Sequence, residues 1–496
     1  MELREAFDYP LSRLDPFADH IDPPSVAVYE TLMVKGPDGK PHPGLATSWT
    51  ISDDGLEWTL RLRHGATFHS GDRCDAKAVV QALEALRYGF HGGQQLWYWD
   101  PVDTVQAVGD EIVAFRLHHP YARLPSLLWG THTAIHNERR RAADPAGSGI
   151  DWADGTGPFR FERYSQERVD VSRWEDYPGS EAAFLRQTGD PVVQSISWTS
   201  MLDPAERVAA LENGEVDCLH GPNYSDVARL EEDSRFDVMR FSQASNLYLA
   251  PNWEQTEFGF ADHRIRQALS LAIDRDRVVR EALMGYGAPT VGPISVGGEF
   301  YDPAVDTGRT HNPQRAANLL DQAGWLRGAS EIRERNGIPF SFECVIQDDA
   351  IHRQAAEIMR AELRNVGIDM RLRPVLTFKG FYEACRSGPD AFINKWLWQD
   401  PVDAALGFTA TRGKPDPNWQ HASIPALDRA YQSWLLASTN VELLAAAADI
   451  QRIAAGQLPY IPIVVPQDVW VRTTKVTNWD PAQSILYPFY HRTSVS

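Results

Sequence analysis

Apolar and polar residues alternate in two short runs between residues 44 and 69, separated by Asp53-Asp54-Gly55. Asp-Gly between alternating runs is typical of a β-hairpin, so we expect two paired strands here. Beyond Asp75, apolar residues recur every three to four positions, at 79, 80, 83 and 86. This spacing predicts a helix with Asp75 as its cap.

Further elements follow along the chain, and their order favours an α/β fold. The turn at 155–158 leads into alternating residues that predict a strand. Helical spacing predicts helices within 204–217, where Gly214 is the expected C-terminal cap before a strand, and over 264–283, 313–322, 351–366 and 443–453. Asp262 is the expected cap of the second of these helices. A strand, a helix and a second strand over 342–372 predict a βαβ unit, and the apolar run 460–465 predicts a buried strand.

Length and charge narrow the class of protein. The chain has 496 residues, enough for two or three packed cores. A net charge of −19 favours solubility and argues against nucleic-acid or anionic-membrane binding. No run approaches the roughly 18 apolar residues of a membrane span. The start, Met1-Glu2-Leu3-Arg4, does not resemble an export signal, so we expect either a cytosolic protein or a mature form without its leader.

Motifs for catalysis and metal binding are missing from the sequence. Cys74, Cys218, Cys344 and Cys385 lie at least forty residues apart, and we expect all four to be free. His132 and His136 are four residues apart, but Thr131, Thr133 and Ile135 favour extended chain there over a metal-binding helix. No nucleophile elbow, zinc-protease or phosphate-loop motif occurs. We therefore expect no catalytic residues, no metal and no cofactor.

Several segments, taken in order, resemble the peptide, nickel and oligosaccharide class (family 5) of extracytoplasmic solute-binding proteins of ABC importers. The matching segments in the first half are Val28-Tyr29-Glu30-Thr31-Leu32, Pro43-Gly44-Leu45-Ala46-Thr47-Ser48-Trp49, Asp53-Asp54-Gly55 with Leu60-Arg61-Leu62-Arg63, and Gly155-Thr156-Gly157-Pro158-Phe159. Those in the second half are Asp262 to Leu269, Ala272-Ile273-Asp274-Arg275, and Asn312 to Ala316 continuing into Leu319 to Trp325. Lys77 departs from the family, which often has an acidic residue there.

The resemblance implies a large two-lobed periplasmic-binding-protein fold, class II-like, with an insert subdomain in the first lobe. Lobe I would comprise 1–40, 161–255 and 470–496, with the insert at 41–160, and lobe II would comprise 256–469. The ligand would be enclosed between the lobes by a hinge motion.

The resemblance also implies a set of ligand-contacting residues. Glu30 belongs to the first matching segment. The loop with Trp396, Trp398, Gln399 and Asp400 falls where the family places ligand contacts, and a tryptophan beside a carboxylate can stack on a ligand and accept its hydrogen bonds. The alternative is that the tryptophans pack in a core and Asp400 forms a turn before Pro401.

Three further positions are candidates for the ligand site. Arg353 lies near where some dipeptide binders hold the ligand carboxylate, although it could instead be a solvated helix residue. Arg412 is a weaker candidate of the same kind. Trp97 and Trp99 could line the cleft or pack in a core. Leu397 stands where peptide binders of the family carry the Asp that holds the peptide ammonium group, so that anchor is not carried over.

The function implied is capture of a peptide-like or other small polar organic solute for the permease and ATPase subunits of an ABC importer. The protein would be a monomer, periplasmic or otherwise extracytoplasmic, and soluble or lipid-anchored. An oligosaccharide or an opine-like sugar and amino-acid conjugate is the alternative ligand, favoured by the 16 tryptophans and the lost ammonium anchor. From other classes, a hydrolase of a polar amide or ester, or a sensory or chaperone-like binding protein, remains open.

Overall fold

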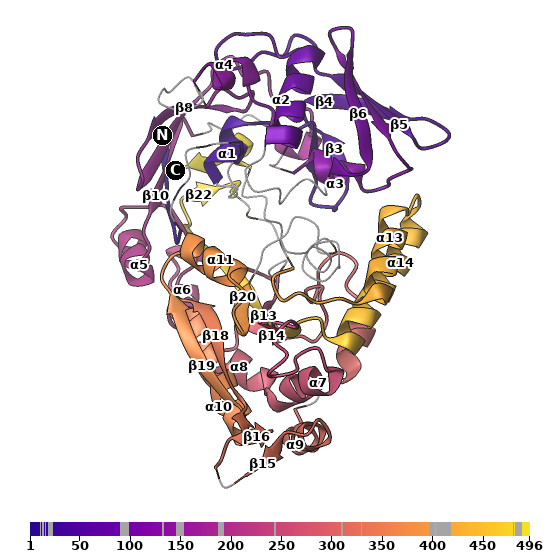
Figure 1. Ribbon diagram of the computed structural model, residues 1–496. Coiled ribbons are helices and arrows are strands. Elements are labelled where there is room, and N and C mark those ends of the chain that lie inside the picture. Colours follow the sequence, from indigo (N-terminus) through magenta and orange to yellow (C-terminus); the bar gives the residue numbers. More distant parts are fainter. Residues whose placement is uncertain are drawn as a thin grey trace. The chain divides into compact units, whose positions relative to one another are not determined.

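The structure is a computed structural model, and its chain divides into two compact units. It describes all residues except 10, 12, 13, 15, 18–22, 90–98, 131–132, 145–152, 187–192, 243–244, 309–310, 329, 396–401, 403–417, 480 and 482–488. Unit 1 comprises Met1–Phe241 and Asp468–Ser496, and unit 2 comprises Ser242–Gln467. Many elements of each unit are labelled in Figure 1.

Unit 1 is built on a mixed sheet in which the order is β11-β1-β10-β9-β8. The strands are β1 (Glu2–Phe7), β8 (Phe159–Tyr164), β9 (Arg168–Arg173), β10 (Ser195–Ser200) and β11 (Cys218–His220). β1 pairs in parallel with both β10 and β11, and residues 470–472 of β21 (Ile461–Thr473) pair antiparallel with β11. Helices α1 (Pro23–Val28), α5 (Pro204–Glu212) and α6 (Tyr224–Glu232) belong to this unit.

A second, antiparallel sheet of unit 1 has the order β4-β5-β7-β6. Its strands are β4 (Ala46–Ile51), β5 (Glu57–Leu62), β6 (Val102–Val108) and β7 (Ile112–Leu117). The predicted hairpin is β4 and β5, and Gly55 in its turn has a φ of 71°. The predicted helix is α2 (Ala76–Gly89), whose cap Asp75 accepts a hydrogen bond from the Ala78 amide at 3.0 Å. Both predictions are confirmed.

Smaller elements complete unit 1. They are β2 (Met33–Lys35) paired with β3 (Pro41–Pro43), α3 (Leu124–Leu128), α4 (Glu138–Ala143), η4 (Ala183–Leu185), β12 (Phe236–Ser242), and β22 (Val476–Thr477) paired with β23 (Ser494–Val495). The 3-10 turn η7 (Tyr490–Arg492) follows near the end of the chain.

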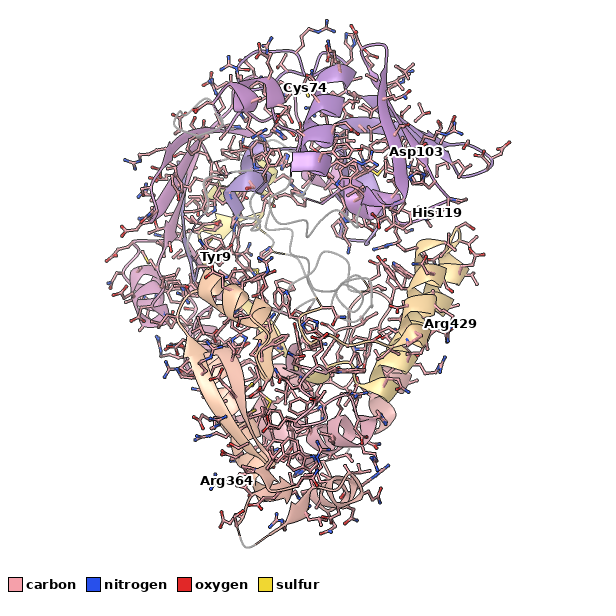
Figure 2. All side chains as sticks on the ribbon, viewed as in Figure 1. Tyr9, Cys74, Asp103, His119, Arg364 and Arg429 are labelled. Carbon is pink, nitrogen blue, oxygen red and sulfur yellow. The ribbon has the colours of Figure 1, made fainter. Side chains whose placement is uncertain are left out.

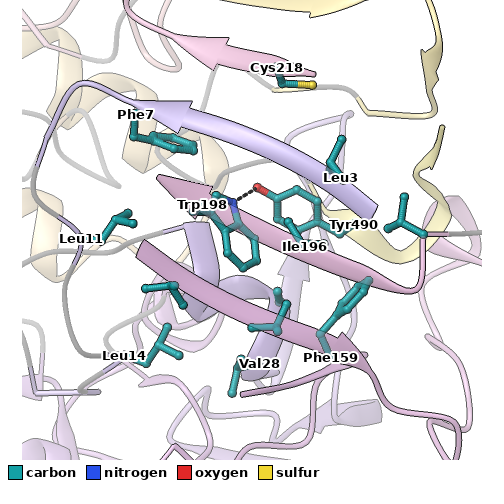
Figure 3. Packing of buried hydrophobic residues seen from close by; sticks show 14 of the residues in the cluster. Leu3, Phe7, Leu11, Leu14, Val28, Phe159, Ile196, Trp198, Cys218 and Tyr490 are labelled. Atoms are coloured by element: carbon teal, nitrogen blue, oxygen red, sulfur yellow. Dashed lines mark hydrogen bonds between the residues drawn. The ribbon is translucent and has the colours of Figure 1, made fainter. Parts of the chain in front are cut away.

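The core of unit 1 lies around β1 and β10, and Figure 3 shows part of it. Trp198 and Tyr490 lie edge to face, and the indole Nε1 donates to the phenol oxygen at 3.1 Å. Glu5 is buried in this core and accepts hydrogen bonds from Trp198 Nε1 and the Tyr490 hydroxyl, each at 2.9 Å. Buried polar groups need such partners, because an unpaired one costs about 1–3 kcal/mol.

Unit 2 contains the predicted βαβ unit. β18 (Ser341–Gln347), α10 (Ala350–Asn365) and β19 (Asp369–Val375) follow one another, and the two strands pair in parallel. β20 (Ala391–Lys395) lies parallel on the other side of β18. β13 (Leu247–Pro251) pairs antiparallel with β20 and with residues 461–464 of β21. The predicted buried strand at 460–465 is therefore confirmed.

The remaining elements of unit 2 are mostly helices. They are α7 (His263–Ala272), α8 (Arg275–Glu281), α9 (Pro313–Gln322), α11 (Phe378–Arg386), α13 (Pro425–Leu435) and α14 (Asn440–Gln457), together with η5 (Pro303–Gly308), β14 (Gly287–Pro289), β15 (Leu326–Arg327), β16 (Arg333–Arg335) and β17 (Ile338–Pro339).

The prediction of one continuous helix over 264–283 is wrong. Asp262 caps α7 as expected, accepting from the Arg264 amide at 2.9 Å. The helix ends at Ala272, because Asp274 caps a new helix, α8, by accepting from the Arg277 amide at 3.1 Å. Two arginines of this region, Arg266 and Arg275, are buried and donate to backbone carbonyls.

All four cysteines are free, as expected, and all four are buried. Figure 2 labels Cys74 beside α2 in unit 1. Burial raises the pKa of each thiol, so the reactive thiolate is disfavoured at every one of these positions.

Candidate functional site

Residues 28–32, which follow α1, are held by hydrogen bonds from three other segments of unit 1. The amides of Gly157, Ile135 and Leu45 donate to the carbonyls of Val28, Glu30 and Thr31 at 2.8, 2.9 and 2.9 Å. These bonds fix the backbone on which the Glu30 side chain is carried.

Glycines allow the neighbouring segments to come this close. A Cβ atom on Gly157 would lie 2.6 Å from the Ala27 carbonyl oxygen, and one on Gly44 would lie 2.5 Å from the Thr31 oxygen. Real Cβ atoms essentially never approach so closely. The two glycine-containing motifs of the sequence are therefore required by packing around residues 28–32.

The Glu30 carboxylate is bound by Arg63, the residue after β5. Arg63 Nη1 lies 2.9 Å from Oε1 and Nη2 lies 2.6 Å from Oε2, a bidentate ion pair. The exposed fractions of the two side chains are only 10% for Glu30 and 7% for Arg63. Paired charges of this kind are among the strongest polar contacts in proteins.

Tyr177 and His491 extend this pair into a network. The Tyr177 hydroxyl lies 3.1 Å from Glu30 Oε1 and 3.1 Å from His491 Nε2. We call Glu30, Arg63, Tyr177 and His491 the Glu30 network. Burial lowers the pKa of His491 to about 4, and it raises that of Tyr177 well above its usual value. At neutral pH both side chains are therefore uncharged.

A small pocket lies within unit 1 next to this network. Glu30, Ser180 and His491 contribute polar groups to its lining. Its other walls are mainly apolar, from Val26, Val34, Trp129, Leu185 and Phe489. An apolar pocket with a few convergent polar groups is the usual form of a small-molecule site.

In unit 2, the parallel strands β18, β19 and β20 end at Gln347, Val375 and Lys395. Ligands of open α/β sheets bind beyond the carboxyl ends of such strands. α10 begins at this edge, directly after β18, and the undescribed residues 396–401 follow β20.

The structure describes three of the predicted site residues. Glu30 lines the pocket and is the centre of its polar network. Arg353, in the first turn of α10, is 58% exposed and pairs with Asp348. Trp99 is 4% exposed, with the Arg87 guanidinium 5.9 Å from its ring centroid. The other six lie outside the described residues: Trp97, Trp396, Trp398, Gln399, Asp400 and Arg412.

Three members of the network were not predicted. Arg63 follows a strand whose alternation indicated only a hairpin, and Tyr177 and His491 belong to no motif. Along the chain, these three residues lie between 33 and 461 positions after Glu30. The signal available for Arg63 was its place in a segment that resembles the family.

Comparisons with known proteins now identify the class. The sequence profile of the bacterial extracellular solute-binding proteins, family 5 Middle, matches residues 40–418. A nickel-binding periplasmic protein of Escherichia coli K12 is 25% identical over 456 residues, which cover 88% of this chain and 83% of that protein. A glutathione-binding protein of Salmonella paratyphi A is 27% identical over 490 residues, covering 94% and 89%.

A solved structure gives the fold over the full length. The periplasmic binding protein DppA of Helicobacter pylori, in complex with the peptide STSA, has a TM-score of 0.84 at 20% identity. The match covers 100% of this chain and 98% of that one. The chain belongs to the family 5 bacterial extracellular solute-binding proteins and has their two-lobed α/β fold.

This membership makes the chain the substrate-binding protein of an ABC importer and places it outside the cytoplasm. Among the described residues, no helix combines the length and the apolar character that a membrane crossing requires. Nor do three or more His, Cys, Asp or Glu side chains gather there in a group that could hold a metal ion.

Proposed function

We propose that this protein captures a peptide-like or other small polar organic solute and delivers it to the permease of an importer driven by ATPase subunits. The protein acts as a monomer, binds the solute without transforming it, and is either soluble or lipid-anchored. The single observation that carries this proposal is the pocket of unit 1, which sets a buried polar network into apolar walls.

Peptide-like solutes match the lining of this pocket in chemistry, because they combine apolar side chains with amide donors and acceptors. The relatives support the same class, since one is named for glutathione and one fold neighbour was solved with a peptide. An opine-like conjugate is the second candidate, favoured by Leu397 in place of the acidic anchor of peptide binders. The name of the nickel-binding relative adds a metal chelate to the compounds worth testing.

The proposed contacts from the second half of the chain are Arg353, Trp396, Trp398, Gln399, Asp400 and Arg412, with Trp97 and Trp99 from the first half. Their role stays a prediction, as do the insert at 41–160 and the lobe boundaries. Arg353 would bind a carboxylate by giving up its present partner Asp348. This exchange leaves the Asp348 carboxylate, whose side chain is only 10% exposed, without its cation unless the guanidinium binds both carboxylates at once.

Uptake of labelled solutes by whole cells tests the proposal. A strain of the source bacterium that lacks this gene should lose uptake of one class of labelled solute among peptides, opines and nickel chelates. The gene supplied in trans should restore that uptake. Unchanged uptake of all three classes, or turnover of any of these solutes by the purified protein, would contradict the proposal.

A further inference from the structure

Strand β21 runs from unit 2 into unit 1 without a break, and the chain changes unit between Gln467 and Asp468. Its neighbour β12 ends where the chain makes its other change of unit, between Phe241 and Ser242. Hinge motions are absorbed by the backbone torsions of a few residues that join two compact bodies. A hinge between the units therefore involves the torsions at these two crossings.

Unit 2 holds β21 up to the last residue before the crossing. Strand β14 pairs with residues 464–466 of β21. The Gln467 amide then donates to the Tyr286 carbonyl at 3.0 Å. The backbone of β21 is therefore anchored to unit 2 as far as the nitrogen of Gln467.

Unit 1 holds β21 from the first residue after the crossing. Both carboxylate oxygens of Asp468 are bound: Oδ1 lies 2.6 Å from His220 Nε2, and Oδ2 accepts from Trp470 Nε1 at 2.9 Å. The next carbonyl, that of Val469, accepts from the Gly221 amide at 3.0 Å. The anchors of the two units therefore meet at one peptide bond.

His220 ties the Asp468 carboxylate to the end of another strand of unit 1. Its Nδ1 lies 2.8 Å from Oδ1 of Asp8, the residue after β1. Burial lowers the pKa of His220, but the two aspartates outweigh it and raise the pKa to about 10. At neutral pH the ring is therefore an imidazolium, which donates from both nitrogens in charge-assisted hydrogen bonds.

Little rotational freedom is left between the two anchors. The peptide bond itself is planar, so rotation is confined to ψ of Gln467 and φ of Asp468. Without His220, Asp468 would lose this charged partner, and the bend would spread into the unit 1 part of β21. His220 therefore decides how sharply the bend is localised.

We propose that β21 bends at the peptide between Gln467 and Asp468 when the solute is captured, and that His220 is the positioning residue that confines the bend there by anchoring Asp468. The inference rests on the proposed function, because a confined bend matters only where the two units move when the solute binds. It adds the residue that sets the place of the hinge in β21.

Hydrogen exchange followed by mass spectrometry tests the anchor in the purified protein. His220→Gln should speed exchange of the amides of 469–472 about tenfold or more, because it removes a charge-assisted bond that opposes local opening. Exchange of the amides of 461–466, on the unit 2 side, should change by no more than about twofold. His42→Gln is the matched control, since it removes another histidine of unit 1 that lies 3.0 Å from an aspartate oxygen, and it should leave both segments unchanged.

A double-mutant cycle separates the contact from general destabilisation. Asp468→Asn should speed exchange of the same segment, 469–472. Combined with His220→Gln, it should do so by clearly less than the product of the two separate factors, because both changes remove the same contact. If His220→Gln does not fold, Asp468→Asn alone is judged by the same outcomes.

Spin labels measure the hinge itself. Ser48 of unit 1 and Ser433 of unit 2 are exposed, so Ser48→Cys and Ser433→Cys give one label on each unit. The four native cysteines are buried, which directs the labels to the two new thiols. Double electron-electron resonance then gives the distribution of distances between the labels. We expect this distribution to broaden in His220→Gln and to keep its width in His42→Gln.

Unchanged exchange of 469–472 in His220→Gln would overturn the proposal. So would equal acceleration of 461–466, exchange factors that multiply in the double variant, or a label distribution of unchanged width. None of these results would touch the importer function, which is tested separately by loss of uptake in the deletion strain.

Discussion

Glu30 and Arg63 form a bidentate ion pair in the interior of unit 1, with nitrogen to oxygen distances of 2.9 and 2.6 Å. Both charges are buried, so either one would be destabilising without the other. The pair fixes a carboxylate beside the pocket while leaving no net charge there. A polar but electrically neutral site suits a solute that must be released again.

Breaking this pair should destabilise unit 1. Glu30→Gln leaves the Arg63 cation buried without a carboxylate, so we expect a loss of about 3–5 kcal/mol in the free energy of unfolding. The double variant Glu30→Leu with Arg63→Met removes both charges and should lose clearly less. Urea unfolding followed by circular dichroism gives these values.

Arg61 and Glu111 provide the matched control. They are 3.3 Å apart, but their side chains are 58% and 36% exposed. Glu111→Gln should therefore cost no more than about 1 kcal/mol. Equal losses of unfolding free energy in Glu30→Gln and Glu111→Gln would contradict the prediction, because burial would then add nothing to the stabilisation by the Glu30–Arg63 pair.

Gly157 should tolerate no side chain. The Cβ of Gly157→Ala would lie 2.6 Å from the Ala27 carbonyl oxygen, so we expect a loss of about 1–3 kcal/mol from overpacking. Gly456, in α14, has no heavy atom within 4 Å of its Cβ position, and Gly456→Ala should stabilise by up to about 1 kcal/mol. Thermal unfolding of the two variants should therefore shift in opposite directions.

His220 should make stability depend on pH in the alkaline range. Its Nδ1 lies 2.8 Å from Asp8 Oδ1, and its Nε2 lies 2.6 Å from Asp468 Oδ1. Burial lowers the pKa of His220, but Asp468 and Asp8 outweigh it and raise the pKa from 6.5 to about 10. The stabilisation is therefore fully present below pH 6.5 and is lost as the pH rises through about 10.

The measurement compares unfolding free energies of the native protein and His220→Gln from about pH 7 to about pH 10. Other titrating groups are common to both proteins, so the difference isolates His220. The difference should shrink as the pH rises. A difference that stays constant over this range would refute the assignment of the raised pKa.

Regular elements with a clear period could be predicted from the sequence. The hairpin before residue 62, α2 with its Asp75 cap and the βαβ unit over 342–372 are all present. The error over 264–283 is local: Asp274 stands within a helical pattern, and its side chain could not be recognised as a second cap. A capping residue inside a periodic run allows two interpretations.

β1 shows what periodicity alone misses. Its sequence, Glu2 to Phe7, contains three charged residues, of which Glu5 is buried, Arg4 is half-buried and Glu2 is exposed, so it does not resemble a central strand. Arg4 is bound by Asp217, with Nη2 2.8 Å from Oδ1, and Glu5 is held by two indoles and a phenol. The partners that stabilise Arg4 and Glu5 in the sheet lie more than 190 residues away along the chain, so no local sequence pattern can indicate them.

The candidate site was predictable only in part for the same reason. Glu30 could be named from the family resemblance, and the structure puts it at the pocket. Tyr177 and His491 reach it through tertiary contacts and carry no motif. The predicted aromatic loop at 396–400 lies outside the described residues and stays a prediction.

Peptides with a free amino terminus should bind poorly. Leu397 offers no charge to an ammonium group, and the acid in the pocket of unit 1 is already paired with Arg63. N-acetylated di- and tripeptides should therefore bind more tightly than the same peptides with free amines. Calorimetric titrations of both series give the comparison, and tighter binding of the free amines would reveal an acidic anchor elsewhere.

The most direct test of the account is native mass spectrometry of the protein as purified, before any unfolding. The account predicts one small organic solute per chain, released when the protein unfolds and recovered chemically unchanged. It further predicts that adding this solute back raises the melting temperature. A protein that retains no solute, and that no peptide, opine or nickel chelate stabilises, would contradict the central claim that this chain is a solute carrier.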